Sequence, residues 1–330
     1  MSSLEVVGIV LAAVVVAVAA FVALLPWLIR PIVRLVLSLR YGIRVRGREN
    51  IPRSGPAVVV SNHVTWIDGL FLCASAPRRG RILANAGFFT NPVLSFLARR
   101  VGIIPIPFTG PKAQRAAITA AREALRRGEV VAIMPEGQLT RTGFVGPFYR
   151  GLEVILKGFD SVPVVPTAID NLWGSILSFQ GGTTVRKRPV GLRRTVAIAF
   201  GPPLTGPPSL FRIRLAILEA NVEARELGGK GPLPLETIDL ALPHLDHAAL
   251  GLLAASAADY DQAGVTQPGQ RPGSVGLPPP GVALRVVDES GGALPEETCG
   301  RIEARVAGRP GWIRTNLRGE LDRDGFLTLA

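Results

Sequence analysis

One histidine of this chain stands where a predicted strand ends. The segment VVVSNHVTWIDGLFL, residues 58–72, begins as an apolar run typical of a buried strand and continues with Asn62 and His63. Asp68 follows five residues after the histidine. A helix that begins near Thr65 would place His63 at its start and Asp68 about one turn further along, with both side chains facing the same cleft.

Two interpretations of this spacing remain open. A carboxylate that is hydrogen-bonded to one ring nitrogen fixes the tautomer of a histidine, and it stabilises the imidazolium when the other nitrogen takes a proton. Such a pair activates a hydroxyl group to attack a thioester. Alternatively, His63 is a core histidine, and Asp68 accepts hydrogen bonds from the first turn of the helix.

A second segment repeats this design. Residues 129–143, EVVAIMPEGQLTRTG, form an apolar run followed by Pro135, Glu136 and Gly137. Ligands bind at the carboxyl ends of strands in α/β sheets. There Glu136 either hydrogen-bonds the hydroxyl groups of an acceptor or anchors the loop, and Gly137 allows a turn that a side chain would block. Arg141, or backbone N–H groups near it, are candidates to hold a phosphate.

The elements that must position these residues alternate along the chain. Short apolar runs predict strands, and the stretches between them have helical periodicity. The strands are expected at residues 57–61, 81–86, 102–107, 130–134, 162–169 and 195–200, and the helices at 91–100, 111–127 and 209–227. This alternation predicts an α/β layer structure around a mostly buried sheet.

The first segment of the chain suits a membrane. Residues 6–29 contain no charged residue, and a bilayer core needs about 20 apolar residues as helix. Arginines follow the run and no Lys or Arg precedes it, which favours a retained anchor over a cleaved signal peptide and places the C-terminal side in the cytoplasm. Residues 32–46 are amphipathic and Arg-rich. They either lie along an anionic leaflet or pack on the folded domain.

The composition indicates a basic protein whose cysteines are reduced thiols. Lys and Arg number 37 and Asp and Glu 25, which gives a formal net charge of +12 in a chain of 330 residues. Such a charge suits nucleic acid or an anionic membrane surface, and the apolar first segment together with the absence of an aromatic and basic recognition pattern disfavours nucleic acid. Cys73 and Cys299 fit no disulfide or metal pattern.

Four ordered motifs carry a resemblance to a known family. NHVTWID at residues 62–68 and, about seventy residues later, MPEG at 134–137 resemble the first and third blocks of the glycerolipid (1-acylglycerol-3-phosphate type) acyltransferase family. RRVGIIPIP at residues 99–107 stands at the place of the second block, and VPVVPTAID at 162–170 resembles the fourth. Because the four blocks keep their order within residues 45–205, the resemblance is specific.

This resemblance implies a mixed sheet flanked by helices and a direct acyl transfer that needs no metal, nucleotide or covalent enzyme intermediate. His63 would be the general base that deprotonates the acceptor hydroxyl, and Asp68 would orient it. The donor would be acyl-CoA or acyl carrier protein, and the acceptor a lysophospholipid, either lysophosphatidylethanolamine or lysophosphatidic acid. The candidate substrate-binding residues are Asn62, Thr65, Trp66, Pro135, Glu136, Gly137 and Arg141.

Two positions depart from the family pattern. Many members have an arginine at the end of the second block, where this chain has Pro107, and another arginine two residues after the glycine of the third block, where this chain has Leu139. These changes weaken the case for lysophosphatidic acid or glycerol-3-phosphate as the acceptor. PEGQLTRTG, and NLWGSILSF at residues 171–179, resemble instead the 2-acylglycerophosphoethanolamine acyltransferase/acyl-acyl-carrier-protein synthetase subgroup, in which an acyl-activating domain is fused.

The C-terminal part supports that subgroup. Residues 258–330 resemble part of an adenylate-forming synthetase, with short strands expected at 282–288, 300–306 and 325–330. Where that family reads Thr-Gly-Asp, this chain reads Thr-Asn-Leu at residues 315–317, so we expect a shortened remnant without adenylation activity.

The sequence therefore predicts four parts and one leading function. The parts are a membrane anchor with an amphipathic helix at 1–40, an acyltransferase domain at 41–227, a linker at 228–265 and a β-rich remnant at 266–330. The expected function is phospholipid biosynthesis by a single-pass membrane enzyme with a cytoplasmic catalytic domain. The alternative is a non-catalytic, membrane-tethered module that binds acyl carrier protein or a partner enzyme.

Overall fold

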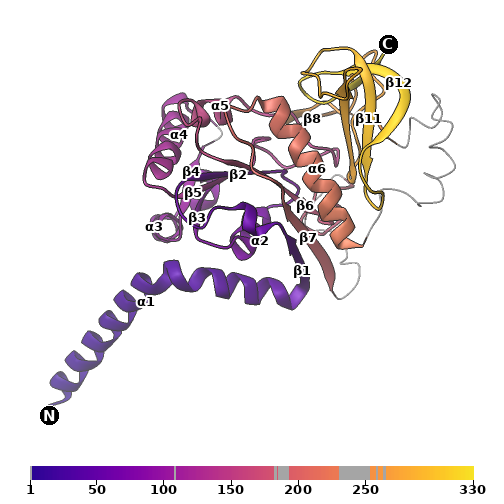
Figure 1. Cartoon of the computed structure of the whole chain (residues 1–330). Helices are drawn as coiled ribbons and strands as arrows, with labels where there is room; N and C mark the ends of the chain where they lie inside the picture. Colours follow the sequence, from indigo (N-terminus) through magenta and orange to yellow (C-terminus); the bar gives the residue numbers. More distant parts are fainter. Residues whose placement is uncertain are drawn as a thin grey trace.

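The described residues form one large sheet, two smaller C-terminal sheets and a long N-terminal helix (Figure 1). The computed structural model describes residues 2–107, 109–181, 184, 193–229, 253–257, 259–262 and 265–330. The strands of the large sheet are β1 (Tyr41–Arg46), β2 (Ala57–Ser61), β3 (Gly80–Asn85), β4 (Ile103–Ile106), β5 (Val130–Ile133), β6 (Val164–Asp170) and β7 (Arg194–Phe200). The helices are α1 (Ser3–Arg40), α2 (Asp68–Ser75), α3 (Pro92–Arg100), α4 (Pro111–Arg126), α5 (Gly151–Leu156) and α6 (Leu210–Gly228), with 3₁₀ turns η1 (Arg48–Asn50) and η2 (Ala86–Phe89).

The large sheet is mixed, as the sequence predicted. Its strand order is β1-β7-β6-β2-β5-β3-β4, and every neighbouring pair is parallel except β6 and β7. The central strand β2 lies between β5 and β6 and is buried along its whole length. Since β2, β5 and β6 are parallel, their carboxyl ends meet at one edge of the sheet, where His63, Glu136 and Asp170 follow or end the strands.

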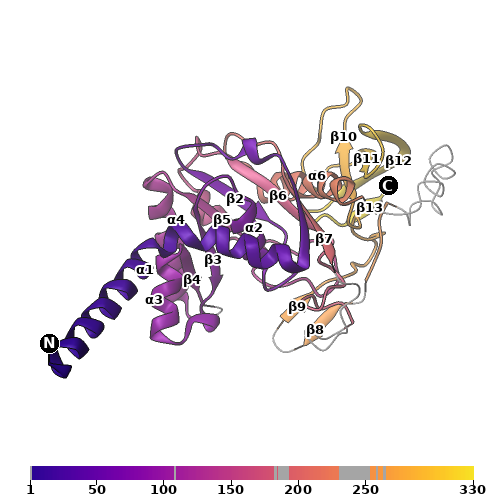
Figure 2. The same ribbon diagram turned by 90° about the horizontal axis from the view of Figure 1, so that it is seen from below.

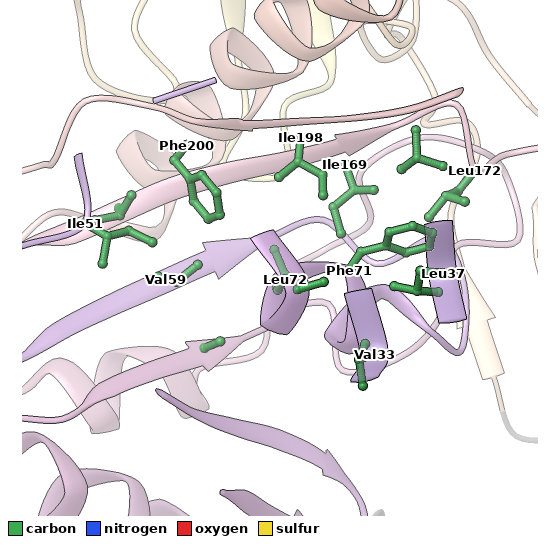
Figure 3. Packing of buried hydrophobic residues seen from close by; sticks show 14 of the residues in the cluster. Val33, Leu37, Ile51, Val59, Phe71, Leu72, Ile169, Leu172, Ile198 and Phe200 are labelled. Carbon is green, nitrogen blue, oxygen red and sulfur yellow. The ribbon is translucent and has the colours of Figure 1, made fainter. Parts of the chain in front are cut away.

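Helices cover both faces of this sheet, and residues of β2 alternate between the two resulting cores. Val59 faces the core under α1 and α2, where it joins Leu37, Phe71 and Ile198 (Figure 3). Val58 and Val60 face the core under α4, α5 and α6. Because side chains of a strand alternate between faces, a five-residue strand buried on both sides must be apolar throughout, as this one is up to Ser61.

Helix α1 has two parts with different surroundings. The segment from Ser3 to Leu24 is almost wholly exposed and apolar, and α1 is long enough to cross a membrane, with a mean hydropathy of 3.1 over an 18-residue window. After Pro26 the helix runs along the domain and buries Val33 and Leu37. Its outer side remains apolar and exposed, at Leu28, Ile32, Leu35, Val36 and Leu39. The amphipathic segment therefore packs on the domain with one face and leaves an apolar face uncovered.

The C-terminal unit, which we define as the described residues from Leu253 to Ala330, consists of two small antiparallel sheets. One is β8 (Tyr260–Gln262) with β9 (Val265–Gln267), and the other is β10 (Val282–Val287), β11 (Gly300–Val306), β12 (Ile313–Leu321) and β13 (Leu327–Leu329). Figure 2 shows the two sheets apart from each other. The four-stranded sheet packs against α6, whose Phe211 lies in its core.

Polar contacts also hold the C-terminal unit to α6. The Asn221 side chain accepts the backbone N–H of Gly281 at 2.7 Å. On either side of Asn221 in α6, Glu219 and Glu223 form ion pairs with Arg305, at 3.5 Å and 3.2 Å. Residues 230–252, which form most of the linker that the sequence predicted, lie outside the described residues.

Candidate active site

His63 and Asp68 lie in direct contact just beyond the end of β2. The Nδ1 atom of His63 is 3.0 Å from Oδ2 of Asp68. The Asp68 side chain is fully buried, whereas 23% of the His63 side chain is exposed. Because an ionised carboxylate only accepts hydrogen bonds, it favours the tautomer with the proton on Nδ1. Nε2 of His63 is then the nitrogen that can accept a proton.

The start of α2 differs from the expectation. The helix begins at Asp68 and not near Thr65, so Asp68 lies at its first residue and not one turn inside. The reason is the hydrogen bonding of the carboxylate, which accepts the backbone N–H of Val64 at 2.6 Å and of Thr65 at 2.9 Å, and the Thr65 hydroxyl at 2.5 Å. These bonds hold the chain before Asp68 in a tight non-helical turn. Asp68 therefore fixes the loop and contacts the histidine with the same oxygen.

Glu136 holds the backbone of the histidine. One carboxylate oxygen accepts the N–H of His63 at 2.8 Å, and the other accepts the N–H of Gly146 at 2.7 Å. Glu136 is only 1% exposed. Burial raises the pKa of Glu136 to about 7, against the opposite effect of these two N–H groups and of the charges on His63 and Arg214. Of its two predicted roles, the geometry supports the anchoring of the loop.

Gly137 permits the turn that follows Glu136. Its φ is +63°, a left-handed conformation, and a Cβ atom at this position would lie 2.8 Å from the ring of Tyr149. Pro135, which is buried, accepts the N–H of Tyr149 at 2.8 Å. A residue with a side chain at position 137 would strain the backbone and displace Tyr149.

Asn62 and Thr65, two candidates for substrate binding, have their polar groups bound within the protein. The Asn62 amide donates to the carbonyl of Ile169 at 3.0 Å and accepts its N–H at 2.9 Å, which ties the end of β2 to β6. The Thr65 hydroxyl donates to Asp68. Both residues are buried. The structure therefore places them as supports of the His63 and Asp68 pair.

Trp66 and Arg141 meet at one aromatic ring, although they follow different strands. The Trp66 side chain is 48% exposed and lies 6.5 Å from Phe179 and 4.9 Å from Phe88, ring centre to ring centre. The guanidinium carbon of Arg141 lies 3.1 Å from the centre of the Phe179 ring. An exposed aromatic group and a cation thus contact the same ring, although neither lines the cavity beside His63. This arrangement suits a ligand with an apolar part and a phosphate.

A cavity of about 30 Å³ opens at the strand ends. His63 and Glu136 line one side of it, and Pro278 and Pro280 of the C-terminal unit line another. A cavity of this volume has room for a water molecule or for a small group such as the reacting hydroxyl.

Two supporting residues were not predicted from the sequence. Arg214 of α6 is 2% exposed and donates to the carbonyls of Val145 at 3.0 Å and Gly146 at 2.5 Å, so that it holds the same loop as Glu136. Its only signal in the sequence is an arginine on the apolar side of a helix. Gln267 of β9 forms hydrogen bonds with the backbone of Leu139 and Arg141 in the same loop. Nothing in its local sequence marks it.

Comparisons with known proteins agree with these motifs. Residues 42–170 match the family model described as Acyltransferase. Among curated proteins, the 1-acyl-sn-glycerol-3-phosphate acyltransferase BAT2, chloroplastic, of Brassica napus is 30% identical over 130 residues, which are 39% of this chain and 37% of the relative. The 1-acyl-sn-glycerol-3-phosphate acyltransferase of Bacillus subtilis is 29% identical over 136 residues, 41% of this chain and 66% of the relative.

A solved structure also resembles the chain. The 1-acyl-sn-glycerophosphate (LPA) acyltransferase PlsC from Thermotoga maritima covers 62% of this chain and 81% of its own, with 20% identity and a TM-score of 0.48. The amide bond synthetase McbA from Marinactinospora thermotolerans matches with 14% identity and a TM-score of 0.16, covering 77% of this chain and 41% of its own.

The sequence matches cover one region of the chain. Residues 42–170 are similar to acyltransferases, both in the family model and in the curated relatives. The particular relatives are 1-acyl-sn-glycerol-3-phosphate acyltransferases, and the chain spans little more than a third of the length of BAT2, the first of them.

Proposed function

We propose that this chain is a membrane-anchored acyltransferase that moves a fatty acyl group from acyl-CoA or acyl carrier protein to the hydroxyl of a lysophospholipid. The observation that carries this proposal is the contact of His63 Nδ1 with the buried Asp68 carboxylate at 3.0 Å, beside a cavity at the strand ends. The Acyltransferase family model that residues 42–170 match supports the reaction class.

In the proposed reaction His63 is the general base. Its Nε2 takes the proton of the acceptor hydroxyl while the hydroxyl oxygen attacks the thioester carbonyl carbon. The carbonyl π electrons move to the oxygen and give a tetrahedral intermediate. This intermediate collapses when the C–S bond breaks, and the proton on Nε2 passes to the leaving thiolate. Asp68, 3.0 Å from Nδ1, stabilises the imidazolium that exists between the two proton transfers.

The acceptor is proposed to bind with its phosphate near Arg141. The names of the relatives favour lysophosphatidic acid, whereas Leu139 at the place of a usual arginine and the PEGQLTRTG motif favour lysophosphatidylethanolamine. Arg141 follows the third motif by four residues, and its guanidinium lies at the ring of Phe179. We propose that it pairs with the phosphate that both acceptors share.

The membrane is proposed to hold α1 and the side of the domain next to it. The N-terminal part of α1 would cross the bilayer once, and the arginines that follow it would place the catalytic domain in the cytoplasm. The exposed apolar face of the rest of α1 would lie in the same leaflet. Arg100 of α3 donates to the carbonyl of Val22, and α3 exposes Val93, Leu94 and Phe96 beside this helix. These surfaces together support a domain seated on the bilayer.

The C-terminal unit is proposed to be a remnant of the adenylate-forming domain of the fused subgroup. The support is the sequence resemblance of residues 258–330, together with the departure at residues 315–317. We propose the division of the chain at residues 1–40, 41–227, 228–265 and 266–330 on the same grounds.

One experiment tests the proposed function. The purified chain in mixed micelles is incubated with a set of lysophospholipids and with acyl-CoA or acyl carrier protein as donor, and the products are identified by mass. The proposal expects one lysophospholipid to gain an acyl chain. If no lysolipid is acylated from either donor while acyl carrier protein binds the chain, the non-catalytic module is correct and the enzymatic proposal is wrong.

A further inference from the structure

We infer that the C-terminal unit helps to hold the catalytic site in place and that its Gln267 is a positioning residue for acyl transfer. This inference rests on the proposed function. It assigns to the unit a task inside the acyltransferase site that is independent of any adenylation activity.

The Gln267 side chain makes a two-point contact with the loop that follows Glu136. Its amide donates to the carbonyl of Leu139 at 2.9 Å, and its oxygen accepts the N–H of Arg141 at 2.7 Å. Gln267 is 2% exposed. A single amide therefore pairs with the carbonyl of Leu139 and the N–H of Arg141, as a neighbouring strand would. Loss of this side chain leaves both backbone groups unpaired.

The residue between these two groups contacts the catalytic histidine. Thr140 donates its N–H to the carbonyl of His63 at 2.9 Å, and its hydroxyl donates to the carbonyl of Phe144 at 2.8 Å. The N–H of His63 is already bound to Glu136 at 2.8 Å. The loop thus holds the histidine at both its backbone groups, and Gln267 holds the loop on either side of Thr140.

The same contact fixes the direction in which Arg141 leaves the loop. Its backbone N–H is bound to Gln267, and its guanidinium lies against Phe179. A change in the backbone at Arg141 moves the cation that is proposed to hold the acceptor phosphate. Small displacements of this kind reduce turnover strongly, because the reacting groups must meet in one geometry.

The four-stranded sheet of the C-terminal unit does not depend on Gln267 for its place. It is packed on α6, where Asn221 binds Gly281, and Arg305 pairs with Glu219 and Glu223. The unit also contributes Pro278 and Pro280 to the cavity wall. Removal of the Gln267 amide should therefore loosen the loop without detaching the four-stranded sheet from α6. This separation makes the inference testable.

The test uses the full chain in mixed micelles with Gln267→Met, which has a similar volume but forms neither hydrogen bond. We expect kcat/KM for the lysophospholipid to fall by about tenfold or more, with the KM for the acyl donor within about twofold of wild type. Hydrogen exchange of peptides covering residues 138–146 should become faster. The matched control is Arg305→Ala, which removes the ion pairs with Glu219 and Glu223 but touches neither Gln267 nor the loop, and it should leave both kinetic constants unchanged.

The outcomes separate the possible failures. If Gln267→Met has wild-type kinetics, or if Arg305→Ala reduces kcat/KM as strongly, the unit only stabilises the fold and the inference is wrong. If Gln267→Met does not fold, Gln267→Glu replaces it. This variant keeps the acceptor for the Arg141 N–H and loses the donor to Leu139, so we expect an intermediate fall in kcat/KM. Wild-type kinetics of Gln267→Glu would overturn the inference. If wild type itself transfers no acyl group, the proposed function fails, and unchanged hydrogen exchange in Gln267→Met then refutes the positioning contact separately.

Discussion

Asp68→Asn isolates the negative charge beside the histidine. The Asn oxygen can take the place of Oδ2, which accepts His63 Nδ1 at 3.0 Å and the N–H groups of Val64 and Thr65. The Asn NH₂ group then faces the Thr65 hydroxyl, which can turn to accept. The turn keeps its hydrogen bonds, so the substitution removes a charge and little else.

The size of the effect follows from the distance. The Nδ1–Oδ2 contact of 3.0 Å places the two charge centres about 4 Å apart, and at an effective dielectric constant of about 20 the charge interaction is about 4 kcal/mol. The imidazolium exists only between the two proton transfers, so this energy is lost from the intermediate and the transition states next to it. A loss of about 4 kcal/mol corresponds to a fall of roughly 10³-fold in kcat.

The assay follows the free thiol that is released from an acyl thioester as lysophospholipid is converted, at saturating concentrations of both substrates. Asp288→Asn is the control. The Asp288 carboxylate also caps a turn, since it accepts the N–H groups of Ser290 and Gly292, but it lies in an exposed hairpin of the C-terminal unit. The control should turn over at the wild-type rate. A kcat for Asp68→Asn within about threefold of wild type would refute the reasoning, because it would correspond to less than about 1 kcal/mol.

Three further predictions concern the loop that holds the histidine. The pKa of Glu136 is raised to about 7 from an ordinary value of 4.5, so its contribution to stability is complete below about pH 4.5 and is lost as the pH rises through 7. Between these pH values the free energy of unfolding, measured with urea, should fall by up to about 3 kcal/mol in wild type, and Glu136→Gln should lack this fall. Equal losses in both proteins would contradict the prediction. Gly137→Ala should lower the free energy of unfolding by about 1–3 kcal/mol, because the new Cβ is strained in a left-handed conformation and meets the ring of Tyr149. A thermal midpoint equal to that of wild type would argue against the observed turn. Arg214→Met removes the donor to the carbonyls of the half-buried Val145 and the buried Gly146. It should cost about 3 kcal/mol in the same urea titration and reduce turnover. An unchanged titration would show that the loop does not need this support.

The sequence predicted the elements with strong local patterns. The strand β2 was predicted with its bounds because all five of its residues are buried. The strand β12 was missed because exposed polar residues such as Asn316 interrupt its few apolar positions. The start of α2 was misplaced because it depends on which N–H groups the Asp68 carboxylate accepts, a choice that spacing does not reveal.

The roles of the supporting residues depend on contacts between distant segments. Gln267 bonds a loop 126 residues earlier in the chain, and Arg214 holds carbonyls 68 and 69 residues earlier. Neither residue has a local pattern that marks such a contact. His63 and Asp68 were found because they are five residues apart and follow one strand, so local spacing was enough to bring them together.

The most direct measurement of the central claim is the turnover of His63→Ala in the thiol-release assay. The backbone N–H and carbonyl of residue 63 carry the contacts to Glu136 and Thr140, so the substitution leaves the loop bound and the fold intact. If the imidazole is the base that takes the proton from the lysophospholipid, kcat should fall by roughly 10²–10⁴-fold at an unchanged thermal midpoint. A folded His63→Ala protein that acylates the lysophospholipid at the wild-type rate would contradict the account.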